Sequence, residues 1–216
     1  MQARQWIWIE GFVAAALALA LFGWLASAVL QNETIWFDAT IRNSLHSLAS
    51  PPLTYFMRGI TELGAPVWLV TISLVLVWTF VQQGRRHAAV MLIVAAVGGE
   101  ALDEILKLVF RRARPEAFFG YAEPITYSFP SGHSVASACF YGVLAAILTA
   151  RIESRARRIA IWTVAALLAL LIGLSRIYLG VHYPSDVVAG YATAVIWVVA
   201  LRTGYDRWCL KRPVAR

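Results

Sequence analysis

The sequence predicts an all-α integral membrane protein, built as a bundle of six transmembrane helices. Of the 216 residues, 60% are hydrophobic and only 14% are charged, and the mean hydropathy is +0.65. A soluble domain of this size cannot bury so much apolar surface. Six apolar stretches approach the roughly twenty residues that a helix needs to cross a bilayer. The length suits a single membrane domain covering residues 1–216.

The six candidate spans are separated by loops that carry most of the charged residues. The spans are residues 11–30, 63–81, 88–110, 132–150, 159–174 and 187–201. The third has acidic residues in its second half, and the last two are short unless their flanks are also helical. Residues 31–62 mix polar and apolar side chains around Pro51-Pro52. This mixture predicts one or two short helices on the membrane surface, in the first outer loop.

The positive charges predict the orientation. With the N-terminus in the cytoplasm, the cytoplasmic segments hold the larger share of the 19 Lys and Arg residues. These are Arg4, Arg85, Arg86, Arg151, Arg155, Arg157, Arg158, Arg202, Arg207, Lys211, Arg212 and Arg216. The outer segments hold Arg42, Arg58, Lys107, Arg111, Arg112, Arg114 and Arg176. This bias favours both termini inside, and it attributes the net charge of +7 to topology rather than to nucleic-acid binding.

The first span has an alternative interpretation. Ala26-Ser27-Ala28 resembles a signal-peptidase site after an apolar stretch. Glu10 directly precedes that stretch, and the residues before it are only weakly basic, which disfavours cleavage. Cleavage would leave the topology of the remaining chain unchanged.

Three polar segments lie beside or inside the predicted spans, where charge is costly and usually functional. They read KLVFRRARP at 107–115, SFPSGHS at 128–134 and SRIYLGVHYPSD at 175–186. They close the third span, open the fourth, and link the fifth to the sixth. The sequence therefore predicts that all three converge at the outer end of one bundle.

The second segment predicts an anion site at a helix start. Pro130 disfavours helix at Phe129, Ser131 is a good N-cap residue, and helix is expected from Gly132 onward. Amides in the first turn have no internal partner and attract anions, phosphate above all. Gly132 allows an anion close to the backbone, and His133 can carry a proton near neutral pH.

The other two segments supply three cations and a second histidine. The cations, suited to phosphate oxygens, are Lys107, Arg114 and Arg176. Pro184 is the expected first residue of the next helix, so Asp186 falls in its first turn. There it can accept a hydrogen bond from the ring of His182. That bond would fix the tautomer and leave the other ring nitrogen free to attack phosphorus.

Together these residues predict phosphoryl transfer through a phosphohistidine. His133 would protonate the leaving oxygen, while the cations and amides stabilise the charge at phosphorus. No cluster of carboxylates lies in these loops to hold magnesium. The two cysteines, Cys139 and Cys209, show no metal-binding spacing. We therefore expect neither a metal nor a cofactor.

The three segments resemble the signature motifs of the type 2 phosphatidic acid phosphatase family, also called lipid phosphate phosphatases. The family pattern is Lys, six residues, Arg-Pro; then Pro-Ser-Gly-His; then Ser-Arg, five residues, His, three residues, Asp. Every spacing fits this chain at Lys107 with Arg114-Pro115, at Pro130-Ser131-Gly132-His133, and at Ser175-Arg176 with His182 and Asp186.

The resemblance implies a role for each of these residues. The catalytic residues would be His182 as nucleophile, Asp186 as its partner and His133 as general acid. The residues that bind the substrate phosphate would be Lys107, Arg114, Ser131, Gly132 and Arg176.

The expected enzyme removes a terminal phosphate from a membrane lipid at the outer, periplasmic face of a bacterial inner membrane. Small bacterial members of the family act on undecaprenyl diphosphate, phosphatidylglycerophosphate or phosphatidic acid, and the sequence does not choose among them. One alternative is a lipid phosphotransferase using the same site. Another is a non-enzymatic anion or lipid transporter, which would need no nucleophile. Related haloperoxidases hold vanadate in a similar site but do not span membranes. The sequence does not predict the oligomeric state.

Several residues near the motifs have two interpretations. Asp103 and Glu104 precede Lys107 by four and three residues, which predicts ion pairs that position its ammonium group, and a proton path that includes Glu100 is the alternative. Arg111 and Arg112 either contact a lipid headgroup or are solvated loop charges. The aromatic residues Phe118, Phe119 and Tyr121 either line a lipid entrance or anchor their loop.

Overall fold

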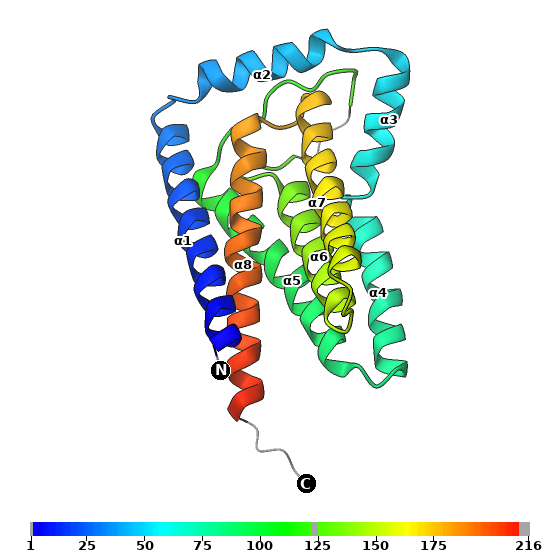
Figure 1. Ribbon diagram of the computed structural model, residues 1–216. Coiled ribbons are helices and arrows are strands. Elements are labelled where there is room, and N and C mark those ends of the chain that lie inside the picture. The colour runs from blue at the N-terminus through cyan, green and yellow to red at the C-terminus, as the bar shows by residue number, and fades with distance from the viewer. Residues whose placement is uncertain (1, 122–124, 212–216) are drawn as a thin grey trace.

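The computed structural model describes residues 2–121 and 125–211, with side chains described from residue 10 to residue 204 outside that gap (Figure 1). These residues form helices and connecting loops without a strand, which confirms the all-α prediction for them. The helices are α1 Gln2–Leu30, α2 Ile35–Ser47, α3 Pro51–Glu62, α4 Pro66–Gln82, α5 Arg86–Phe110, α6 Gly132–Thr149, α7 Arg155–Tyr178 and α8 Pro184–Lys211.

The long helices run side by side as a bundle, and α2 crosses one end of it (Figure 1). Helix α6 packs against α5, α7 and α8, while α1 packs along α8 and α4 along α5. Each predicted span falls almost entirely within one of the long helices. The stretches predicted as 159–174 and 187–201 are extended by helical flanks at both ends, as α7 and α8.

The predicted count of six spans is not confirmed. Four helices of the described chain are long and apolar enough to cross a membrane: α1, α6, α7 and α8. Helices α3 and α4 meet at an angle of 45° and together form a fifth candidate. Helix α5 is not among them, because Glu100, Asp103 and Glu104 interrupt its apolar surface. The chain is therefore a multi-pass membrane protein with four or five candidate spans.

The segment 31–62 forms the two short helices that were expected, but only one lies across the bundle. Helix α2 does so, with three large apolar side chains exposed: Ile35, Trp36 and Phe37. Helix α3 turns down along α7 instead and leads into α4 (Figure 1). The reason is that α3 buries one face, where Met57 packs with Tyr178 at the end of α7.

Phe129 holds the last part of the loop between α5 and α6 in place. Phe129 is fully buried among side chains of α1 and α8, and its ring lies 5.0 Å from that of Phe110. The start of α6 is thereby held against α8. A Cβ atom at Gly190 would lie only 2.8 Å from the Ser131 carbonyl oxygen, so this close approach needs glycine.

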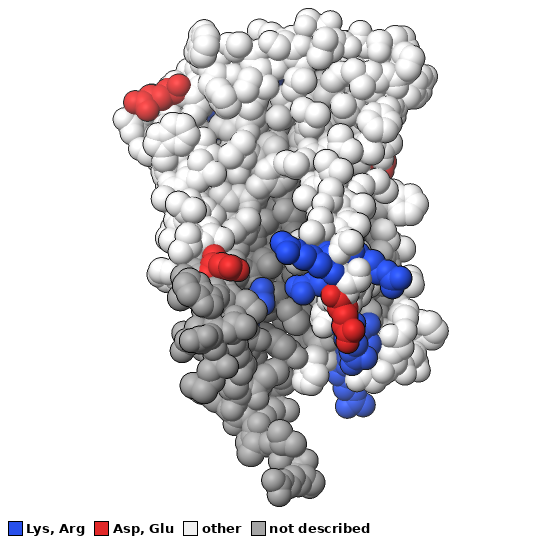
Figure 2. All heavy atoms as spheres, viewed as in Figure 1, with Lys and Arg blue, Asp and Glu red and all other residues white. Residues whose placement is uncertain are grey.

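Helix α1 begins and α8 ends at the same end of the bundle, opposite α2 (Figure 1). Figure 2 shows Lys and Arg side chains gathered toward that end. Those around the α6–α7 turn are exposed, namely Arg151, Arg155, Arg157 and Arg158. Of the predicted cytoplasmic cations, the side chains of Arg4, Arg207, Lys211, Arg212 and Arg216 lie outside the described residues. That this end is cytoplasmic stays a prediction.

Candidate active site

The three polar segments meet at the end of the bundle beneath α2. The Ser128 N–H donates to the Arg112 carbonyl oxygen over 2.8 Å, which folds the α5–α6 loop back on itself. The Ser131 N–H donates to the Asp186 carbonyl oxygen over 3.0 Å, which joins the start of α6 to the start of α8. The convergence that the sequence predicts is therefore observed, with His182 at its centre.

His182 lies in the turn between α7 and α8 and is only 2% exposed. Its Nδ1 lies 3.4 Å from Asp186 Oδ2 and 3.4 Å from Ser128 Oγ. Its Nε2 lies 3.1 Å from Nη1 of Arg114. A guanidinium group can only donate, so Nε2 is the unprotonated nitrogen and Nδ1 carries the hydrogen. This is the tautomer that leaves Nε2 free to act as a nucleophile.

The protonation state of His182 follows from its surroundings. Burial holds the pKa of His182 well below its usual value, and the positive charges of Arg114, Arg176 and Lys107 lower it further. The ring is therefore neutral near neutral pH.

Asp186 lies in the first turn of α8, as predicted, and is fully buried. Its Oδ2 accepts hydrogen bonds from the Ser128 hydroxyl at 2.5 Å and from the Tyr183 N–H at 2.9 Å. Its Oδ1 accepts from Arg112 at 2.5 Å. Both carboxylate oxygens are therefore held by hydrogen bonds, and Oδ2 is kept pointing toward His182.

Lys107 belongs to an ion-paired group on α5, here named the Lys107 cluster (Asp103, Glu104 and Lys107). The ammonium nitrogen lies 2.6 Å from Asp103 Oδ2 and 2.9 Å from Glu104 Oε1, which confirms both predicted ion pairs. A Cβ atom at Gly132 would lie 2.7 Å from Asp103 Oδ2 and 3.2 Å from Lys107 Nζ. The first-turn amides of α6 therefore lie beside this cluster, and glycine is required for that approach.

Ser131, Arg176 and His133 complete the group of predicted residues. Ser131 is fully buried, and its hydroxyl has no hydrogen-bond partner among the described residues. A buried hydroxyl without a partner is costly unless a ligand satisfies it. Arg176, which is 2% exposed in the last turn of α7, donates to Thr61 Oγ1 over 3.0 Å. His133 lies in the first turn of α6, within electrostatic reach of Arg176, His182, Arg114 and Lys107.

The sequence interpretation missed the position of Arg112. Its side chain is 14% exposed and lies between two carboxylates, with Nη2 at 2.7 Å from Asp38 Oδ2 and Nη1 at 2.5 Å from Asp186 Oδ1. We call this group the Arg112 cluster (Asp38, Arg112 and Asp186). Neither a headgroup contact nor a solvated loop charge describes it. The only sequence feature that pointed to Arg112 as a site residue was its position two residues before Arg114, which is a weak indication. No sequence feature pointed to Asp38.

The aromatic residues of the same loop act as anchors. The Phe118 ring stacks on His46 with ring centroids 4.0 Å apart. The Phe119 ring stacks on Tyr178 at 5.5 Å, and Tyr121 packs in the same apolar cluster as Tyr178. These contacts favour the anchoring interpretation over a lipid entrance.

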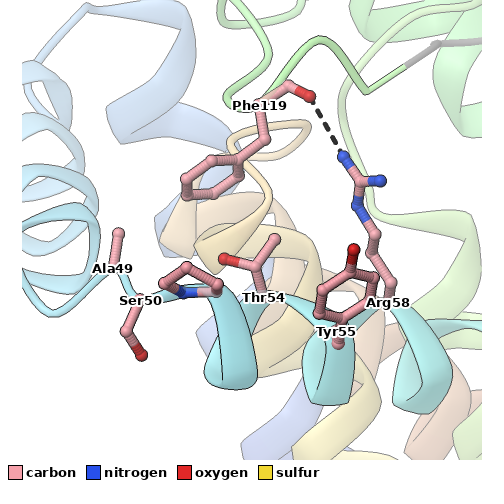
Figure 3. A pocket seen from close by; sticks show the side chains of 7 residues that line it. Ala49, Ser50, Thr54, Tyr55, Arg58 and Phe119 are labelled. Atoms are coloured by element: carbon pink, nitrogen blue, oxygen red, sulfur yellow. Dashed lines mark hydrogen bonds between the residues drawn. The ribbon is translucent and has the colours of Figure 1, made fainter.

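A hollow of 390 Å³ opens beside α3 (Figure 3). It is lined by Ala49, Ser50, Pro51, Thr54, Tyr55, Arg58 and Phe119, and Arg58 donates to the Phe119 carbonyl oxygen over 3.0 Å. A second, of 710 Å³, lies at the start of α7 beside Arg155 and Arg158. Neither is lined by a predicted site residue, so both are separate from the site.

The structure also brings three carboxylates together on α5. Oxygens of Glu100, Asp103 and Glu104 lie within 4.8 Å of one another, a spacing that could hold a metal ion. Asp103 and Glu104 already bind the ammonium group of Lys107, however. The ion pair accounts for their positions without a metal ion.

The sequence model of the PAP2 superfamily matches residues 87–208, which contain all three motifs. The chain is 31% identical over 185 residues to phosphatidylglycerophosphatase B of Bacillus subtilis, covering 84% of this chain and 89% of the relative. It is 31% identical over 234 residues to a lipid A 1-phosphatase of Rhizobium johnstonii, covering 91% and 88%. It is 29% identical over 192 residues to an undecaprenyl-diphosphatase of Sulfolobus acidocaldarius, covering 86% and 84%.

The fold comparison agrees with the sequence comparison. The crystal structure of a transmembrane PAP2-type phosphatidylglycerolphosphate phosphatase from Bacillus subtilis superposes with a TM-score of 0.81 at 28% identity. The match covers 94% of this chain and 98% of that one. The chain therefore belongs to the PAP2 superfamily and is a membrane-bound hydrolase of that family.

Proposed function

We propose that this protein hydrolyses the terminal phosphate of a lipid phosphate or diphosphate through a phosphohistidine on His182. The observation that carries the proposal is the hydrogen bonding of that ring. Nε2 faces Arg114 at 3.1 Å, and Nδ1 faces Asp186 at 3.4 Å. A neutral ring whose unprotonated nitrogen lies beside a cation is suited to attack an anionic phosphate.

The first step forms a bond between His182 Nε2 and phosphorus and breaks the bond to the leaving oxygen. His133 donates its proton to that oxygen, which departs as the lipid alcohol or the lipid monophosphate. The ring of His182 becomes positive, and Asp186 stabilises this charge through Nδ1. A water molecule then attacks the phosphohistidine while His133 takes up its proton. Inorganic phosphate and the neutral ring are regenerated.

The phosphate oxygens would be bound by the residues that surround the ring: Lys107, Arg114, Ser131, Gly132 and Arg176. Arg114 contacts Nε2 directly in this structure, so its guanidinium lies beside the position where phosphorus must approach. Binding would transfer that hydrogen bond from the ring to a phosphate oxygen. The Ser131 hydroxyl, which has no hydrogen-bond partner among the described residues, and the N–H groups in the first turn of α6 would supply further donors.

A lipid substrate suits the position of the site at one end of the bundle. Headgroups lie at the level where spans end, so the acyl or prenyl chains can stay in the bilayer. The relatives are named for phosphatidylglycerophosphate, lipid A and undecaprenyl diphosphate, at 31%, 31% and 29% identity. Because these values are similar, we propose the shared lipid phosphate class, which includes phosphatidic acid.

We further propose that the site faces the periplasm from a bacterial inner membrane, with both termini in the cytoplasm. The support is the cluster of exposed arginines at the α6–α7 turn, at the end of the bundle opposite the site. Reporter fusions at the C-terminus should be active only in the cytoplasm, and activity only outside would contradict this orientation.

The test of function is phosphate release by the purified full-length protein from each of these lipids. We expect release from at least one lipid, and none from the His182→Ala variant under the same conditions. Mass spectrometry of the lipid products separates hydrolysis from transfer to a lipid acceptor. Equal release by wild type and His182→Ala, or transfer without free phosphate, would overturn the proposal.

A further inference from the structure

The two oxygens of the Asp186 carboxylate have different partners. Oδ2 faces the catalytic side, where it lies 3.4 Å from His182 Nδ1 and accepts from Ser128 and the Tyr183 N–H. Oδ1 faces the other way and is held by Arg112. The direction of the carboxylate toward His182 therefore depends on a residue outside the set predicted to bind phosphate.

The guanidinium of Arg112 is itself fixed by several acceptors. Besides Asp186, it donates to Asp38 Oδ2 at 2.7 Å, to Ser185 Oγ at 2.8 Å and to Thr34 Oγ1 at 3.1 Å. It also lies 4.0 Å above the ring of Tyr183. Four of its contacts are hydrogen bonds to protein oxygens, so most of its donors are already used. Arg112 is therefore poorly placed to bind a phosphate as well.

Asp38 closes this arrangement from the surface helix α2. It is 1% exposed, and it accepts from the Ser185 N–H at 2.9 Å and from the Ser185 hydroxyl at 2.7 Å. Ser185 directly precedes Asp186 in the first turn of α8. Helix α2, the α5–α6 loop and the start of α8 are thus joined by the Arg112 cluster. A buried carboxylate is costly without a partner, so removing Arg112 would release or protonate Asp186.

We propose that Arg112 and Asp38 are positioning residues of the reaction, which hold Asp186 ionised and aimed at His182. Helix α2 is then part of the active site, although it carries none of the family motifs. The inference rests on the proposed role of His182 and Asp186. The role proposed for Arg112 differs from that of Arg114. Arg114 contacts Nε2, the attacking nitrogen of His182, whereas Arg112 contacts Asp186 on the Nδ1 side of the ring.

The experiment measures kcat and KM for the full-length Arg112→Lys, Arg112→Gln and Asp38→Asn variants, on a lipid phosphate that wild type hydrolyses. We expect Arg112→Gln to lower kcat by ~10- to 100-fold, with KM within about twofold, since only the tautomer and orientation of the nucleophile His182 are disturbed. Arg112→Lys should keep more activity than Arg112→Gln, because it preserves the charge. Asp38→Asn should show a smaller loss of the same kind.

The matched control is Arg111→Gln. Arg111 is the exposed neighbour, and its Nε donates to the Leu108 carbonyl oxygen of its own helix at 3.0 Å. Its kcat and KM should match wild type. Thermal unfolding of all variants in the same detergent identifies any that lose the fold. If Arg112→Gln does, the comparison rests on Arg112→Lys and Asp38→Asn.

Two results would overturn the inference. One is a raised KM with unchanged kcat in the Arg112 variants, which would make Arg112 a phosphate-binding residue. The other is normal kinetics in every folded Arg112 and Asp38 variant. Failure of the proposed function is separate, since it would appear as an active His182→Ala protein. An inactive His182→Ala protein with normal Arg112 variants would refute the inference alone.

Discussion

The Lys107 cluster and the Arg112 cluster both place one cation between two carboxylates, but they are built differently. The first lies on consecutive turns of α5, at spacings of three and four residues. The second joins α2, the α5–α6 loop and α8, with a separation of 74 positions in sequence between Arg112 and each of its carboxylates. One is local and the other depends entirely on the tertiary fold.

The two clusters also differ in which group is proposed to act in the reaction, a cation in one and a carboxylate in the other. In the Lys107 cluster both Asp103 Oδ2 and the Lys107 ammonium lie beside the start of α6, and the proposed phosphate-binding group is the cation, which the carboxylates hold. In the Arg112 cluster a carboxylate, Asp186, faces the histidine, and the cation holds that carboxylate. In the proposed mechanism, the same ion-pair chemistry would support phosphate binding on one side of the site and orientation of the nucleophile His182 on the other. This difference predicts different kinetic defects for the two clusters.

The largest effect is expected at the two histidines of the site, His133 and His182. His182→Ala and His133→Ala should each lower turnover by at least ~100-fold, since nucleophilic attack or proton donation is lost. Phosphate release measures turnover. A phosphohistidine trapped in wild type is recognised because its P–N bond is cleaved by acid, whereas phosphate esters of serine or threonine are stable to acid. A His182→Ala protein with near-normal turnover would remove the basis for comparing the clusters at all.

The comparison itself is tested by neutralising one carboxylate in each cluster. Asp186→Asn should lower kcat by ~100-fold, because His182 loses its orienting acceptor. Asp103→Asn should change KM by less than ~10-fold and leave kcat nearly unchanged, since Glu104 still pairs with Lys107. Steady-state kinetics on one lipid phosphate separates the two outcomes. Similar kcat losses in both variants would show that the clusters do not differ in role.

The pH dependence of kcat/KM tests how the cations around His182, Arg114 among them, affect its pKa. Burial and the charges of Arg114, Arg176 and Lys107 lower the pKa of His182, so the neutral nucleophile persists below the usual histidine range of ~6.5. Arg114→Gln removes one of these charges and should raise the pKa of His182. The acid limb of kcat/KM then moves to higher pH than in wild type. An unchanged acid limb would mean that the limb does not report His182.

The smallest effect is expected on removing metal ions. The carboxylates of the Lys107 cluster already bind an ammonium group. Excess EDTA should therefore leave the rate of phosphate release within about twofold of the rate without EDTA. Glu100→Gln should likewise leave the rate of phosphate release nearly unchanged. Loss of activity on chelation, restored by magnesium, would assign the three α5 carboxylates to a metal instead.

The sequence by itself determined the features that depend on neighbours along the chain. It located the long helices, the N-cap at Ser131, the first turn of α8 at Pro184 and the ion pairs of Lys107. Helix spacing and backbone preference fix these locally. The motif spacings also identified the residues that gather around His182, because each motif sits at the end of a helix.

The tertiary structure alone decided which arginine enters the site. Arg111 and Arg112 are adjacent and chemically identical, so no local rule separates them. Arg111 ends α5 with a left-handed φ of 46°, and its N–H donates to the Lys107 carbonyl oxygen at 2.9 Å. This turn leaves Arg111 exposed and directs Arg112 inward to Asp38, whose other partner, Ser185, lies 147 residues away. Such pairings arise only from packing helices together, since no periodicity along the chain links these positions.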